Sequence, residues 1–166
     1  MSSHVILAVA AVALSVAVVL IKRLVRRRSG PRSGAIDDLA AWADGQARAD
    51  AKQHYQIDLD GSDESVRLVE DILGKISALA HDSQGRLKEG MSGMAMMYGM
   101  YIGECIRRNH GGTWGVDHEA GGPKSYPFRH RSDSFPTAWA YRRIVNGAED
   151  NVWMKYRILV IEDRPE

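Results

Sequence analysis

The longest run of apolar positions lies near the start of the chain, at residues 5–21. It reads VILAVAAVALSVAVVLI, and Ser15 is its only polar side chain. A helix rises about 1.5 Å per residue, so this run spans roughly 25 Å, slightly less than the ~30 Å hydrocarbon core of a bilayer. His4 and the aliphatic part of Lys22 can extend that reach. We therefore expect residues 1–24 to form a transmembrane anchor, with residues 5–21 inside the lipid bilayer.

Basic residues follow the apolar run directly, and residues 1–32 contain no Asp or Glu. The basic positions are Lys22, Arg23, Arg26, Arg27, Arg28 and Arg32. The positive-inside rule predicts a single-pass protein of the inner (plasma) membrane, with the N-terminus outside and the following residues in the cytoplasm. A cleaved signal peptide would normally carry its positive charge before the apolar run. The basic residues could also bind anionic lipid.

The rest of the chain has the opposite charge. Without the six residues of the basic cluster, 16 of the 22 Lys and Arg remain against 21 Asp and Glu, a formal charge of −5. An acidic body without a basic stripe argues against a nucleic-acid partner. Gly30, Pro31 and Gly34 interrupt any helix, so residues 25–34 are predicted to be a basic juxtamembrane linker before a cytoplasmic domain at residues 35–166.

Three helices are predicted in the first part of this domain. The first runs from residue 35 to about 56, with an alanine-rich apolar stripe. The second is capped by Ser62, with Asp63 and Glu64 in its first turn. The third begins near Met91 and ends at residues 109–112. The stripe of the first is Ile36, Leu39, Ala40, Ala43, Ala47 and Ala51, and the core face of the second is Val66, Val69, Ile72, Leu73, Ile76 and Leu79.

The third helix is apolar around most of its circumference, which is typical of a central helix. Glycine in a helix costs about 1 kcal/mol relative to alanine, so Gly99 and Gly103 indicate close approach of another backbone. After it, TWGVDH and SYPFRHR alternate like strands, with Trp114, Val116, Tyr126 and Phe128 facing inward.

The end of the chain is again helical in pattern. Pro136 begins a helix with apolar positions Trp139, Tyr141, Ile144 and Val145, closed by Asn146 and Gly147. Glu149 and Asp150 begin the last helix, in which Val152, Tyr156, Leu159 and Val160 share a face. The expected fold class is α+β, with an N-terminal transmembrane helix followed by a mainly helical cytoplasmic domain that contains a small antiparallel sheet.

Residues with reactive side chains gather in YGMYIGECIRRNHGGTW, residues 98–114. Arg107 and Arg108 lie three and four residues after Glu104 and can pair with it, although a carboxylate beside glycines could also contact a ligand. Cys105 shares a face with apolar residues, which indicates a buried thiol rather than a reactive one. Five helical residues separate it from His110, an angle of about 140°, which disfavours a Cys–His pair.

A metal site is a weaker alternative. Its candidate ligands are His110, His118 and His130 with Asp117 or Glu119, but no pair has the spacing of a strong metal motif. The sequence therefore predicts no metal, no cofactor and no catalytic residue.

Four segments recur in the order of a known family. They are LDGSDESVRLVEDIL, YGMYIGECIRR, GGTW and FPTAWAYRRIVNGAEDNV, within about residues 57–153. They resemble an uncharacterised bacterial domain family of unknown function, with an LDxSxxSL helix start, a YxGExI helix, a GGxW strand and a proline-led helix ending in NGxED. The resemblance implies no catalytic residues. It marks Glu104, Gly111, Gly112 and Trp114 as motif positions, and Cys105 stands where an aliphatic residue is usual.

These patterns favour a membrane-anchored cytoplasmic protein-binding module, immunity-like or an adaptor, with a protein partner in the cytoplasm or at the membrane. The alternative is a small enzyme or metal-binding domain that uses residues 104–118. The expected contact region is residues 110–126, because loops on a rigid scaffold commonly carry recognition. The candidate interaction or motif positions are Glu104, His110, Gly111, Gly112, Trp114 and Tyr126.

Overall fold

The computed structural model of the protein describes residues 33–121 and 125–162. All the described residues belong to one of the two units into which the chain divides, Ser33–Glu166. The predicted anchor and its basic cluster lie outside the described residues. Within these ranges, no helix is both long enough and apolar enough to cross a membrane.

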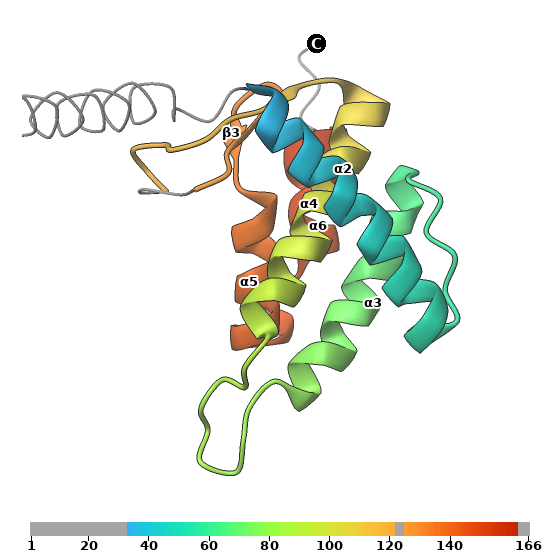
Figure 1. Ribbon diagram of the computed structural model, residues 1–166, viewed down its shortest axis with the longest axis vertical. Coiled ribbons are helices and arrows are strands. Elements are labelled where there is room, and N and C mark those ends of the chain that lie inside the picture. Colours follow the sequence, from blue (N-terminus) through green and yellow to red (C-terminus); the bar gives the residue numbers. More distant parts are fainter. Residues whose placement is uncertain (1–32, 122–124, 163–166) are drawn as a thin grey trace, which may run out of the picture. The chain divides into compact units, whose positions relative to one another are not determined.

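The first helix is α2, Ser33–Asp50, which continues as the π-helical turn η1, Ala51–Tyr55. Gln56 ends it in the left-handed conformation, with a φ of 59°, and its N–H bonds the Ala51 carbonyl. The predicted stripe is confirmed except at Leu39, which is only partly buried. Because the buried side chains are mostly alanines, α2 lies close to α4 (Figure 1).

Helix α3, Asp63–Leu79, begins as predicted. The Ser62 hydroxyl accepts a hydrogen bond of 3.3 Å from the Ser65 N–H. Its predicted core face is buried as far as Ile76, but the prediction is wrong at Leu79, whose exposed fraction is 69%. Leu79 is the last residue of α3, and the following Ala80 is the buried one because the chain turns there.

Helix α4, Met91–His110, is the central helix, packed against α2, α3 and α5, Pro136–Asn146 (Figure 1). A Cβ atom on Gly99 would lie 2.3 Å from the Cα of Thr137 in α5, so the predicted backbone approach is confirmed there. At Gly103 the neighbour is instead a side chain, because a Cβ would lie 2.1 Å from the Trp114 ring.

The described residues contain a three-stranded antiparallel sheet in the order β1-β2-β3. Its strands are β1, Thr113–Trp114, β2, Phe128–Arg129, and β3, Asp133–Ser134. Trp114 pairs with Phe128, and both are buried as predicted. The strands are shorter than the pattern predicted, and Val116 and Tyr126 are only partly buried, because the chain continues as an irregular hairpin. Its hydrogen bonds join Gly115 N to Pro127 O and Asp117 N to Ser125 O.

Helix α5 ends at Asn146 before Gly147, as predicted, but Tyr141 is 42% exposed and faces away from the core. The end of the chain differs from the prediction because Glu149 and Asp150 belong to a 3₁₀ turn, η2, Ala148–Asp150. Asn151 then caps α6, Val152–Tyr156, and the chain continues as the π-helical η3, Arg157–Glu162. Leu159 is exposed, because the wider π turn rotates it off the face of Val152, Tyr156 and Val160.

A buried ion pair connects these C-terminal elements to α3. Glu70 accepts a hydrogen bond of 2.5 Å from Arg143 of α5 and one of 2.7 Å from the backbone N–H of Val152 in α6. Gly74 leaves room for the Arg143 guanidinium, which a Cβ would approach to 2.8 Å. The described domain is thus mainly helical with a small antiparallel sheet, an α+β fold.

Candidate functional site

Glu104 lies at the centre of a contact between α4 and β1. Its exposed fraction is 2%, and its Oε1 accepts a hydrogen bond of 2.9 Å from the indole Nε1 of Trp114. Its Oε2 lies 2.6 Å from Arg107 and 3.9 Å from Arg108, so the predicted pairing is confirmed. Each carboxylate oxygen therefore has a donor, as a buried charge requires.

Gly103 makes this contact possible. The Trp114 ring lies where a side chain at position 103 would be, and the ring also meets Phe128 edge to face at 5.0 Å between centroids. The adjacent Gly and Glu of the helix motif thus receive the ring and the indole N–H of one tryptophan. This geometry explains how the Gly103-Glu104 pair and the GGTW segment contact each other in this chain.

The two arginines after Glu104 also reach α2. Arg107 lies 3.1 Å from Asp37, and Arg108 lies 2.8 Å from Asp44. Asp44 is buried and is also paired with Arg48 at 3.0 Å. These ion pairs hold the C-terminal half of α4 against α2. Arg107 and Arg108 therefore have a structural role.

Cys105 is fully buried, as predicted. Its sulfur lies 3.8 Å from the Ser65 hydroxyl, and burial raises the pKa of the thiol to about 11. Thiols react as thiolates, so a buried neutral thiol is a poor nucleophile.

His110 is bound to the start of α3. Its Nε2 lies 2.9 and 3.0 Å from the two carboxylate oxygens of Asp63, and the Tyr156 hydroxyl donates to the same carboxylate at 2.6 Å. Burial, followed by this hydrogen bond, raises the pKa of Tyr156. Asp63 of α3 therefore connects α3 to the end of α4 and to α6. The His110 imidazole contacts Asp63, whereas the Cys105 thiol contacts Ser65, so the two groups have different partners.

The double glycine has a conformational role. Gly111 caps α4 with a φ of 79°, and Gly112 has a φ of 116°. A Cβ on Gly112 would lie 2.5 Å from the carbonyl oxygen of Arg129 in β2. Both positions thus favour glycine through backbone geometry, and the turn passes the chain from α4 directly into β1.

His118 organises the far part of the hairpin. Its Nδ1 accepts the Ala120 N–H at 3.1 Å, so the proton of the neutral ring is on Nε2, which lies 2.8 Å from Asp133. The ring of His130 meets that of His110 at 5.9 Å between centroids. Among the described residues, no three His, Cys, Asp or Glu side chains are grouped as metal ligands.

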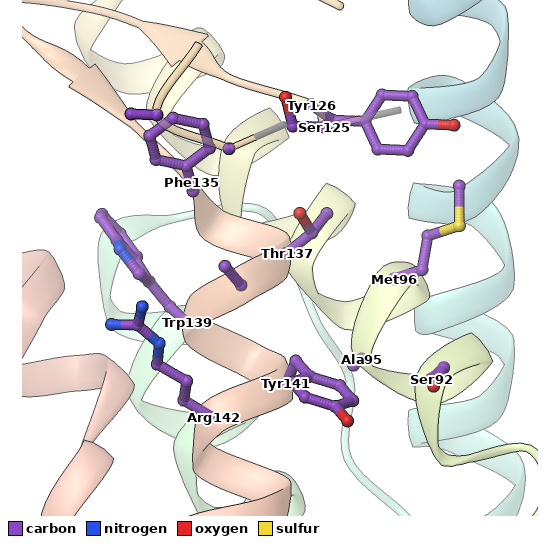
Figure 2. Close-up of a pocket in the computed structure, with 13 residues that line it drawn as sticks. Ser92, Ala95, Met96, Ser125, Tyr126, Phe135, Thr137, Trp139, Tyr141 and Arg142 are labelled. Carbon is purple, nitrogen blue, oxygen red and sulfur yellow. The ribbon is translucent and has the colours of Figure 1, made fainter. Parts of the chain in front are cut away.

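A pocket of about 520 Å³ lies between α4 and α5, beside the described hairpin residues Ala120, Gly121, Ser125 and Tyr126. Tyr126 and Ser125 are at one end of it, and Tyr141 and Arg142 are at the other (Figure 2). Its remaining lining residues are Ser92, Ala95, Met96, Ala120, Gly121, Phe135, Thr137, Ala138 and Trp139. Tyr126 is thus the one sequence-based candidate position that lines the pocket.

Apart from the hairpin residues of the expected contact region 110–126, the pattern of the sequence does not identify the pocket residues, and it does not identify the contacts of Asp63. The pattern places Tyr141 among the apolar positions of its helix, and it predicts an apolar surface around most of the helix that contains Met96. Asp63 had a sufficient explanation as a residue of the first helical turn. The exposed side of α5 and the contact between Asp63 and His110, which lie 47 positions apart in the sequence, are results of the tertiary packing, which a local pattern does not contain.

Comparison with known proteins adds no assignment to this geometry. No family model, curated protein or solved structure matches the chain. The functional argument therefore depends on the contacts and surfaces of the described residues.

Proposed function

We propose that the protein is a membrane-anchored cytoplasmic binding module, an adaptor or immunity-like protein, whose partner is another protein. The observation that carries this proposal is the pocket between α4, α5 and the described residues of the hairpin. One side of it is lined by Ala120, Gly121, Ser125 and Tyr126, which belong to the expected contact region 110–126, and the rest is lined by α4, Phe135 and α5. We place the contact on Tyr126, Tyr141 and Arg142 rather than on the double-glycine turn.

The residue types of the pocket favour a protein partner. Tyr, Trp and Arg are enriched among residues that dominate the energy of protein interfaces, and all three types line this pocket. Tyr141 is 42% exposed although it is aromatic. The walls are helices held together at the Gly99–Thr137 contact, so the pocket is preformed, which lowers the entropic cost of binding.

The other candidate residues support the same conclusion. Glu104, Cys105 and His110 all have internal partners that explain their chemistry as packing. A general base and its nucleophile should lie within hydrogen-bond reach of each other, whereas here the thiol contacts Ser65 and the imidazole contacts Asp63. The enzyme alternative therefore has no supporting observation.

The location of the module is part of the proposal. The apolar residues 5–21 and the basic cluster after them support a single-pass anchor with an outside N-terminus and a cytoplasmic domain. A tether would concentrate the module at a membrane-associated partner. We also propose membership of the uncharacterised bacterial family, supported by the GE and GGxW segments that meet at Trp114.

Cross-linking in native membranes tests this function. The full chain is expressed in its own host at its natural level, cross-linked with a lysine-reactive reagent and analysed by mass spectrometry. We expect at least one other protein to be enriched, compared with cells that lack the chain. Recovery of no protein, with a small molecule or metal present at full occupancy in the purified chain, would contradict the proposal.

A further inference from the structure

We propose that the pocket between α4 and α5 binds a short peptide segment of the partner in which a large apolar side chain lies next to a carboxylate. This inference rests on the proposed function and adds the chemistry of the bound segment. It follows from the walls, the charge and the free hydroxyl groups of the pocket.

The walls select the apolar side chain. Met96 projects from α4, Phe135 precedes α5, and Tyr141 projects from its exposed side (Figure 2). Ligand pockets usually have volumes of about 300–1,000 Å³ and mostly apolar walls with a few polar groups; the volume of about 520 Å³ falls in that range. A methionine and aromatic wall adapts to different apolar side chains, because the thioether is flexible.

The charge of the pocket selects the carboxylate. Among the described lining residues, Arg142 is the basic one, and none is Asp or Glu. None of the ion pairs within 4 Å in the described ranges includes Arg142. The nearby Asp150 is already bound by Lys155 and by Asn146, the latter at 2.7 Å. The guanidinium is thus available for a carboxylate, which it binds through two parallel N–H groups.

The hydroxyl groups suit a peptide backbone. Ser92 and Thr137 line the pocket, and neither hydroxyl takes part in the side-chain hydrogen bonds found in the described part of the chain. Ser125, by contrast, accepts the His118 N–H at 2.9 Å and has a structural role. Two hydroxyl groups beside apolar walls provide donors and acceptors for the amide groups that flank an apolar side chain.

A peptide library tests the inference directly. The purified full-length chain in detergent is the target for phage-displayed random seven-residue peptides, and the Ser92→Trp variant is used for counter-selection. Ser92 lines the pocket and is exposed in the first turn of α4, so we expect the larger indole to obstruct the pocket with little effect on the core. Circular dichroism and thermal unfolding check that the variant folds like the parent.

Synthetic copies of the selected peptides are then measured against single variants. We expect the peptides to share an aromatic or large aliphatic residue within two positions of Asp or Glu. Arg142→Gln should weaken their binding about tenfold or more, because a charge-assisted hydrogen bond is lost. The matched control is Arg131→Gln, an exposed arginine that does not line the pocket, and it should leave the affinity unchanged.

The outcomes separate this inference from the proposed function. Three results would overturn the inference. The selected peptides lack an acidic residue, they bind Ser92→Trp as tightly as the parent, or they bind Arg142→Gln as tightly as the parent. Failure to select any peptide over Ser92→Trp would overturn it as well. If cross-linking recovers the same amount of a partner from Ser92→Trp and from Arg142→Gln as from the parent, the protein-binding function is retained and this pocket is not the binding site.

Discussion

Single residues in this protein combine reactive chemistry with internal contacts, and Glu104 is the clearest example. Its pairing with Arg107 and Arg108 could be predicted from their spacing along one helix. Its hydrogen bond with Trp114 could not, because that contact joins a helix to a strand beyond a glycine turn. The same limit applies to His110, since its cap position was evident and its partner Asp63 was not.

Removing the charge of Glu104 tests whether the residue is structural. In Glu104→Gln an amide would replace one oxygen and place a donor against the arginines or the indole. We expect a loss of about 1–3 kcal/mol in the free energy of unfolding, measured with urea. The control is Glu64→Gln, because its pair with Arg67 is exposed and should matter little. A variant as stable as the parent that no longer cross-links its partner would show a functional role instead.

The buried thiol predicts a pH dependence. Burial raises the pKa of Cys105 from 9.0 to about 11, so the folded chain keeps a proton that the unfolded chain loses in this range. The contribution of the thiol to stability is complete below pH 9 and falls as the pH rises toward 11. We expect the difference in unfolding free energy between the parent and Cys105→Ala to change over that window only. Rapid alkylation of the folded parent at neutral pH would contradict this account.

At the scale of secondary structure, the helices were more predictable than the strands. Caps at Ser62, Gly111 and Gly147 fixed helix ends through local geometry, and the apolar periodicity gave most of the buried faces. Three residues that the pattern places in the core are exposed. Leu79 is at a helix end, Tyr141 is on the pocket side of α5, and Leu159 is in a π-helical turn. The two-residue strands depend on the position of Trp114 against α4, which is a tertiary contact.

The crossing of α4 and α5 leads to a prediction with a built-in control. Gly99→Ala would place a methyl group 2.3 Å from the Thr137 Cα, a backbone atom that cannot move alone. We expect a loss of roughly 1–3 kcal/mol in stability from overpacking. Gly93→Ala lies on the same helix with no atom within 4 Å of its Cβ and should stabilise the protein by up to about 1 kcal/mol.

Thermal and urea unfolding of the two alanine variants test whether α4 and α5 approach each other closely at Gly99. Equal stability of Gly99→Ala and Gly93→Ala would mean that the two helices do not approach each other as described. Gly103→Leu belongs to the same test, because any side chain there displaces the Trp114 ring. It should lose stability without reaching the backbone of α5.

At the scale of the whole molecule, the proposal joins an N-terminal anchor to a preformed binding pocket. The anchor is an inference from the apolar run and its basic cluster, whereas the pocket is a property of α4, α5 and the hairpin. The composition could indicate an acidic body with a tether. It could not indicate the pocket, because the pocket residues come from segments on both sides of the hairpin.

Cysteine labelling tests the orientation of the anchor. In a Cys105→Ala background, we expect Ser3→Cys to react with an impermeant maleimide in intact cells and Glu166→Cys to react only after permeabilisation. The reason is the basic cluster after residue 21, which favours the cytoplasmic side. The reverse pattern of labelling would contradict the proposed topology.

Binding of a protein through the pocket is measured by comparing cross-linked products in native membranes. The parent, Ser92→Trp and Arg131→Gln are expressed at equal levels, and each product is quantified by mass spectrometry. We expect the parent and Arg131→Gln to yield the same enriched partner and Ser92→Trp to yield about tenfold less of it. Equal recovery from all three chains, or no enriched protein from the parent, would contradict the account.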